Sequence, residues 1–143
     1  MPYRYLEEEA TADVAFEAWG ESLEEVFRAS AEATLNVMVE EVESVTARES
    51  VPIELNIEAL DLLLFDFLQR IIYYKDVDQL LLRVPELQFQ RDDETWALRA
   101  VARGERLDPE RHQQIVDVKA VTFHGFRLEE RDGKWQAHVL LDI

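Results

Sequence analysis

Apolar side chains recur with helical spacing in residues 20–41. This segment opens with Ser22 and Glu25, a Ser-x-x-Glu capping box of the kind that satisfies free N–H groups at the start of a helix. One stripe of side chains then follows at i, i+3 and i+4 spacing: Leu23, Val26, Phe27, Ser30, Thr34, Val37 and Met38. The spacing predicts an amphipathic helix with most of its acidic side chains away from the buried stripe.

A second helical pattern covers residues 58–76 and is apolar around most of its circumference. Its broad apolar face consists of Leu60, Leu63, Leu64, Phe67, Leu68, Ile71 and Ile72, and further apolar positions are Leu62, Phe65, Tyr73 and Tyr74. A helix of this kind is usually covered on more than one side, so we expect it at the centre of the fold. Asp66 is expected either on a narrow exposed stripe or as a cap for a nearby backbone group.

The remaining segments alternate with a period of two, which is typical of strands. The predicted extended segments are residues 13–19, 51–57, 86–105 and 115–143. Turn signals at 92–94 and at Asp132-Gly133 predict two hairpins within them. Residues 103–114 form the longest predicted loop. Together these patterns predict an α+β fold: a single domain, residues 1–143, built as a two-layer sandwich with a mostly antiparallel or mixed sheet and two main helices on one face.

Charge is the most informative feature of the composition. The 143 residues include 31 acidic and 15 basic side chains, for a formal net charge of −16. Affinity for nucleic acid depends largely on neutralising phosphates with Lys and Arg, so no direct nucleic-acid binding is expected. A divalent cation or a basic protein is the better candidate for a binding partner.

The common signatures of catalysis and of membrane insertion are missing. The chain has no cysteine, its four glycines are dispersed, and its histidines and serines form no metal-binding or nucleophile motif. The first residues lack the apolar core of a secretory signal, and no run approaches the roughly 20 apolar residues that span a bilayer. We therefore expect a cytoplasmic protein, without contact to membranes, that is not itself an enzyme.

Carboxylates are the chemistry that remains. Asp13 opens an early predicted strand, and Asp142 lies near the end of the last one, on the face opposite the apolar side chains. With the main-chain carboxylate of Ile143, they form a candidate site for Ca²⁺, Mg²⁺ or Mn²⁺, since hard cations prefer oxygen ligands. In a chain this acidic, the alternative is ordinary solvated surface charge. Lys119 is expected either to extend to solvent or to pair with these carboxylates, and His124 to be a hydrogen-bonded strand residue.

Five blocks of sequence resemble one family in their order and approximate spacing. They are "ATADVAFEAWGESLEEVFRASAEA", "LLLFDFLQRIIYYKD", "GERLDPERH", "VDVKAVTFHGF" and the terminal "VLLDI". The chain is similar to archease, an acidic protein cofactor of the RNA-splicing ligase RtcB, over essentially its whole length. The resemblance implies an α+β fold, a metal-binding acidic cluster, and help to RtcB in guanylylation and repeated turnover.

The resemblance assigns roles to particular positions. Asp13 and Asp142 match the family's metal-binding aspartates, the chain end at Ile143 adds a carboxylate, and Lys119 matches a functional lysine that we expect to face the partner. Two positions depart from the family pattern: Ala10 replaces a histidine and Arg70 replaces a glutamate. Two other functions remain open as alternatives, a metal-dependent hydrolase or phosphotransferase and a chaperone-like scaffold.

Overall fold

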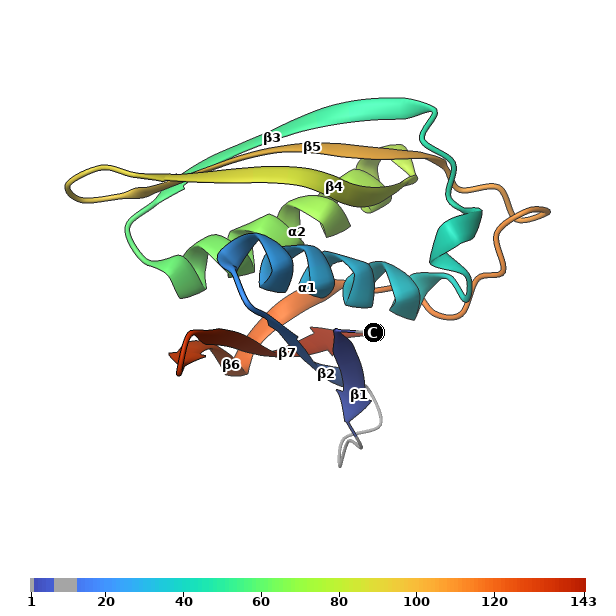
Figure 1. Ribbon diagram of the computed structural model, residues 1–143. Helices are drawn as coiled ribbons and strands as arrows, with labels where there is room; N and C mark the ends of the chain where they lie inside the picture. The colour runs from blue at the N-terminus through green and yellow to red at the C-terminus, as the bar shows by residue number, and fades with distance from the viewer. Residues whose placement is uncertain (1, 7–12) are drawn as a thin grey trace.

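The protein is described by a computed structural model that covers residues 2–6 and 13–143 (Figure 1). Its helices are α1 (Leu23–Met38), α2 (Leu60–Asp78) and a short 3-10 helix, η1 (Val42–Ser44). Its strands are β1 (Tyr3–Leu6), β2 (Asp13–Gly20), β3 (Glu49–Ile57), β4 (Leu80–Arg91), β5 (Trp96–Arg106), β6 (Ala120–Arg131) and β7 (Lys134–Asp142). Within these residues, neither α-helix combines the length and the apolar character needed to cross a membrane.

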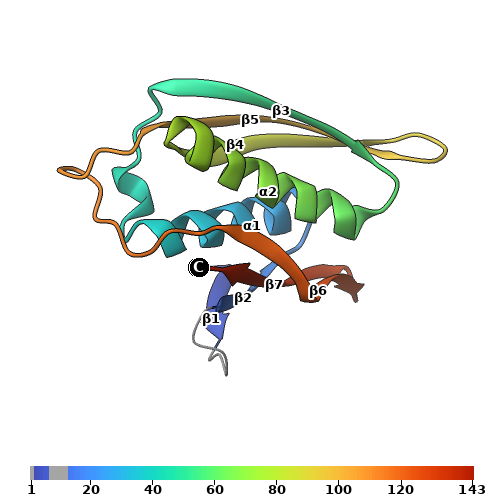
Figure 2. The same cartoon turned by 180° about the vertical axis from the view of Figure 1, so that it is seen from behind.

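The strands form two antiparallel sheets, and both α-helices lie between them (Figures 1 and 2). One sheet has the order β1-β2-β7-β6, and the other has the order β3-β5-β4. The predicted α+β sandwich, with antiparallel pairing and two main helices, is confirmed. The arrangement differs from the prediction in one respect. The strands divide into two sheets, one on either side of the helices, so the helices form a middle layer instead of covering one face of a single sheet.

The capping box at the start of α1 is confirmed. The Ser22 hydroxyl accepts a hydrogen bond from the backbone N–H of Glu25, at 3.2 Å. The Glu25 carboxylate accepts in return from the backbone N–H of Glu21, at 2.6 Å, one residue earlier than in the usual motif. Ser30 and Thr34 are fully buried, and each hydroxyl donates to a carbonyl of the preceding helical turn. These polar members of the predicted stripe are therefore satisfied within the core.

Helix α2 is central to the fold, as its apolar circumference predicts. It contacts β3 and β4 of one sheet and β6 of the other. The rings of Phe27 on α1 and Phe67 on α2 lie 5.6 Å apart and join the two helices. One stripe of α2 stays open to solvent, with Leu62 and Tyr73 exposed and Asp66 half-buried between them. Asp66 thus follows the first of its two predicted alternatives.

Both predicted hairpins are present. Between β4 and β5, an Asp92 carboxylate oxygen accepts hydrogen bonds from the backbone N–H groups of Glu94 and Thr95. Between β6 and β7, Asp132 and Gly133 adopt left-handed conformations with φ of 53° and 78°. Two consecutive left-handed residues match the right-handed twist of a tight hairpin. Strand β1 was not predicted, because four residues are too few to show a clear alternation.

Candidate cation and partner site

The structure places Asp13 and Asp142 side by side. Strands β2 and β7 are antiparallel neighbours, and their register sets Asp13 directly opposite Asp142. Directly opposite residues in an antiparallel pair project from the same face, with Cβ atoms about 4.5–5.5 Å apart. Both residues are half-buried. Two carboxylates that are 129 positions apart in the sequence therefore meet where β2 begins and β7 ends, on the two inner strands of the four-stranded sheet.

The apolar face of β7 fixes this register. Ala137, Val139 and Leu141 are fully buried in the core, and Val139 lies opposite the buried Phe16 of β2. A shift of one residue would turn these side chains to the other face of the sheet, which would expose the apolar set. Because the register is set by core packing, Asp142 is directed to the opposite face and held next to Asp13.

The backbone of Lys119 adjoins the same pair. Strand β6 flanks β7 on the side away from β2, with Ala120 opposite Asp142. The backbone N–H of Lys119 donates to the carbonyl oxygen of Asp142, at 2.8 Å. The Lys119 side chain is exposed, and it forms no ion pair with the described acidic residues. The structure therefore brings Lys119 to the site through its main chain and leaves its ammonium group available to a partner.

A buried lysine that the sequence reasoning did not identify holds this edge in place. Lys75 lies in the last turn of α2 and donates to the carboxylates of Asp76 and Asp117. It also donates to the carbonyl oxygen of Val118, at 2.7 Å. Burial acts to lower the pKa of Lys75, but the bonds to Asp117 and Asp76 outweigh it and raise the pKa above its usual value. Lys75 thus stays charged and fastens the residues before Lys119 to α2.

We expect Lys75→Met to loosen this edge more than the rest of the fold. Without the ammonium group, the carbonyl of Val118 loses its donor, and residues 117–119 lose their attachment to α2. The amide of Lys119 should then exchange with solvent at least tenfold faster, while amides in the centre of β5 keep their protection. Hydrogen exchange followed by NMR measures both. Lys134→Met, at an exposed lysine of the β6–β7 hairpin, is the matched control and should change neither.

The electrostatics of the Asp13–Asp142 pair suit a hard cation. Like charges directly opposite each other destabilise a sheet, and no ion pair with a described basic side chain offsets this repulsion. In the described part of the chain, no group of three His, Cys, Asp or Glu side chains is placed to hold a metal ion. Ca²⁺ takes six to eight oxygen ligands. A cation bound here would therefore need oxygens besides those of Asp13 and Asp142, from the main chain, from water or from a partner.

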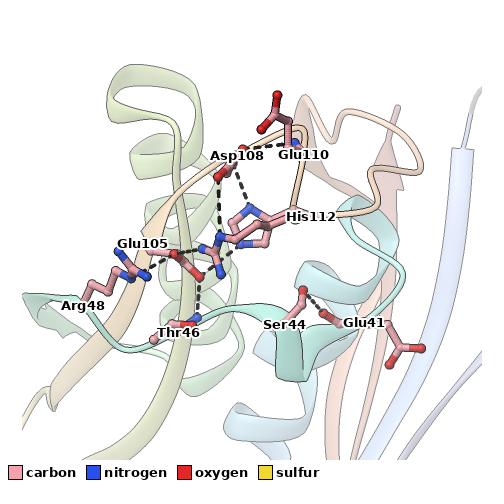
Figure 3. Close-up of polar contacts among 9 residues, drawn as sticks. Glu41, Ser44, Thr46, Arg48, Glu105, Asp108, Glu110 and His112 are labelled. Atoms are coloured by element: carbon pink, nitrogen blue, oxygen red, sulfur yellow. Dashed lines mark hydrogen bonds and ion pairs between the residues drawn. The ribbon is translucent and has the colours of Figure 1, made fainter.

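A second polar centre closes the long loop between β5 and β6 (Figure 3). The Glu105 carboxylate is almost fully buried and accepts from the backbone N–H of Thr46, at 2.6 Å. It also pairs with the guanidinium groups of Arg111 and Arg48 and with Nε2 of His112, which lies at 3.1 Å. These contacts join the end of β5 to the distant segment at Thr46 and Arg48 and to the loop that follows β5. The predicted loop at 103–114 begins later than expected, because β5 continues to Arg106, and the remainder is ordered around a buried carboxylate.

The hydrogen bonds of His112 define which ring nitrogen carries its proton. Its Nδ1 accepts from the backbone N–H of Asp108, at 2.8 Å, so the ring proton lies on Nε2 and is donated to Glu105. Burial acts to raise the pKa of Glu105. The bonds from Thr46 and His112, with the positive charge of Arg111, outweigh it and lower the pKa to about 2. Every group in this centre already has a partner, so its role is to stabilise the loop.

The other positions considered from the sequence lie apart from the carboxylate pair. His124 is exposed in the irregular part of β6, between Thr122 and Arg127, and has no hydrogen-bond partner among the described residues. Its predicted position in a strand is confirmed. Arg70 is half-buried on α2. Ala10 lies outside the described residues.

The fold and the paired carboxylates define an acidic α+β domain with a candidate cation site at the ends of two paired strands. Its sequence matches the model of the Archease protein family over residues 3–143. The chain belongs to this family.

Individual relatives agree over nearly the whole chain. The sequence is 37% identical to protein archease of Pyrococcus abyssi, covering 98% of this chain and 99% of that protein. It is 35% identical to protein archease of Methanopyrus kandleri, covering all of both. The solution structure of protein 1598 from Methanobacterium thermoautotrophicum is similar with a TM-score of 0.85, at 32% identity and 99% coverage of both chains. A crystal structure from Thermotoga maritima, described as an archease and possible chaperone, shares the fold with a TM-score of 0.61, at 21% identity and 96% coverage of both.

Proposed function

We propose that this protein is a non-catalytic cofactor of the RNA ligase RtcB, which promotes guanylylation and multiple turnover of the ligase in tRNA splicing or RNA repair. The observation that carries the proposal is the register that sets Asp13 opposite Asp142. These are the two aspartates that the archease resemblance assigns to a metal site, and they come from opposite ends of the chain. Membership of the archease family supports the same function.

The proposed ligands of a divalent cation are Asp13, Asp142 and the carboxylate of Ile143, and the cation is Ca²⁺, Mg²⁺ or Mn²⁺. A cation held there would neutralise the repelling carboxylates and supply a positive charge for phosphate oxygens at the ligase active site. Lys119 is proposed to face the ligase beside this pair. With a net charge of −16, the protein is suited to electrostatic attraction by a ligase that must itself be basic to bind RNA.

A ligation assay under multiple-turnover conditions tests the proposal. The ligase is titrated with the full chain, and ligated RNA is followed together with the guanylylated form of the ligase. We expect both the rate of guanylylation and the number of turnovers to rise and then saturate. Unchanged turnover at saturating protein would show that the proposal is wrong. Metal-dependent hydrolysis of phosphoesters by the protein alone would favour the enzyme alternative, and suppression of aggregation of unrelated proteins would favour the chaperone-like one.

An extension beyond Ile143 tests the third proposed ligand. A short tag of neutral residues would move the main-chain carboxylate away from Asp142 without changing any side chain. We expect cation affinity, measured by isothermal titration calorimetry, to fall at least tenfold. The same tag at the N-terminus is the matched control. If the C-terminally tagged protein bound the cation as tightly as the untagged one, the carboxylate at Ile143 would not be a ligand.

A further inference from the structure

The large apolar side chains that are exposed on this protein gather on one side. Eight such residues are exposed in the described part of the chain, and six of them belong to α2, the loop after β5, or the start of β6. These six form what we call the α2 band: Leu62, Tyr73, Val77, Ile115, Val116 and Phe123. Their exposed fractions range from 37% to 65%. A clustered set of this kind marks an interaction surface more often than scattered exposed residues do.

Contacts join the three elements that carry the band. Leu62, Tyr73 and Val77 share one stripe of α2, at spacings of 11 and 4 residues, which spans about 22 Å at 1.5 Å per residue. At one end, the ring of Phe123 stacks on Phe65, with centroids 3.9 Å apart. At the other end, Lys75 fastens the residues that follow Val116 to the last turn of α2. Figure 2 shows α2 and the segment leading into β6 next to each other.

The band and the candidate cation site are linked through the main chain at the start of β6. The backbone N–H of Val121 donates to the side-chain oxygen of Gln69, at 2.8 Å, which fixes β6 against α2 between the two ends of the band. One residue earlier, Ala120 lies opposite Asp142. The main chain of Lys119 and Ala120 therefore lies between the band and the backbone of Asp142, whose carboxylate projects from the face of the sheet away from the helices.

The charges around the band specify the chemistry of its partner. Five aspartates border it in sequence: Asp61, Asp66, Asp76, Asp78 and Asp117. The basic residues in the same region are Arg70, Lys119 and Lys75, and Lys75 is already paired with Asp76 and Asp117. Five carboxylates against three cationic groups leave an acidic excess among these residues, which complements a basic surface around an apolar patch. A second copy of this chain would oppose aspartate to aspartate across a two-fold contact, so this excess disfavours self-association.

We infer that the α2 band is the surface with which this protein docks on a basic protein partner. The inference rests on the proposed function, in which that partner is the RNA ligase, and it adds the place of contact. The band supplies affinity through its apolar centre. The adjacent carboxylate pair then acts at the ligase active site without having to supply the binding energy itself.

Binding measurements on the full chain test this assignment. Tyr73→Ala and Val77→Asp alter exposed side chains in the centre and at the end of the stripe, so we expect their melting temperatures to stay within two degrees. Calorimetry against the ligase should show a Kd at least tenfold weaker for each. Trp19→Ala, at an exposed aromatic on β2 away from the band, is the matched control and should change the Kd less than twofold. Asp142→Asn should retain binding while losing stimulation, since docking and action use different residues.

Each result decides between defined outcomes. If the unaltered chain binds and stimulates the ligase and the two band variants bind equally well, the docking surface is wrong and the proposed function stands. If the unaltered chain neither binds nor stimulates, the proposed function is wrong and the docking surface falls with it. Sedimentation that shows a dimer in the unaltered chain and a monomer in Val77→Asp would overturn the assignment in favour of a contact between copies.

Discussion

Asp142→Asn is expected to reduce stimulation of the ligase at least tenfold while leaving the fold at least as stable as before. The side chain projects from the solvent-facing side of β7, opposite Asp13, and the core face of the strand is untouched. Replacing one of two directly opposed carboxylates removes a repulsion, so the free energy of unfolding should stay constant or rise by up to about 1 kcal/mol. Loss of a cation ligand or of a charge that pairs with the partner should reduce stimulation at least tenfold. Asp13→Asn should behave in the same way.

The two measurements are a turnover assay and urea denaturation of the same preparations. Glu49→Gln is the matched control, because it makes the same change of charge at an exposed position on the other sheet. It should leave both stimulation and stability unchanged. Asp142→Asn with full stimulation would remove the carboxylate pair from the mechanism. A loss of stability of 2 kcal/mol or more would show that Asp142 supports the fold. Stimulation would then have to be measured on another variant of the pair that keeps its stability.

The carboxylate pair was accessible from the sequence because it depends on local patterns. The alternation of residues 135–143 directs Asp142 away from the core, and an aspartate at the start of a strand is visible by inspection. Alternation does not tell which strands are neighbours, so the direct opposition of Asp13 and Asp142 required the tertiary register. Their convergence was a hypothesis drawn from the two strand ends, and the resemblance to archease supported it.

Lys75 and Glu105 were missed for a related reason. Each is a charged residue whose burial depends on a distant partner, Val118 for Lys75 at 43 positions and Thr46 for Glu105 at 59 positions. Contacts between residues so far apart in the chain produce no periodic pattern in the sequence. The division of the strands into two sheets was also missed, although the apolar circumference of α2 indicated it. A helix covered on opposite sides needs two layers around it, and one sheet supplies only one.

The largest loss of stability is expected from Glu105→Ala. The substitution removes the acceptor for the backbone N–H of Thr46 and for Nε2–H of His112, and both donors are held in place by the fold. Removing one partner of a buried charged network costs about 3–5 kcal/mol, and the partial exposure of Arg111 and Arg48 reduces this to about 2–4 kcal/mol. Urea denaturation measures the change. Glu110→Ala, an exposed residue in the same loop, is the control and should stay within about 0.5 kcal/mol.

The pH dependence of unfolding separates the charge of Glu105 from its packing. Its pKa is about 2 in the folded protein, against an ordinary value of 4.5. A carboxylate whose pKa is lowered by folding stabilises the folded state fully above the unfolded pKa, and this contribution disappears as the pH falls toward the folded pKa. The difference in stability between the unaltered protein and Glu105→Gln should therefore be constant above pH 5 and shrink between about pH 4.5 and 2. Gln keeps the size of the side chain and one acceptor oxygen, so this comparison isolates the charge. If the difference in the free energy of unfolding stayed constant across this window, the charge of Glu105 would contribute nothing and the side chain would act through hydrogen-bond geometry alone.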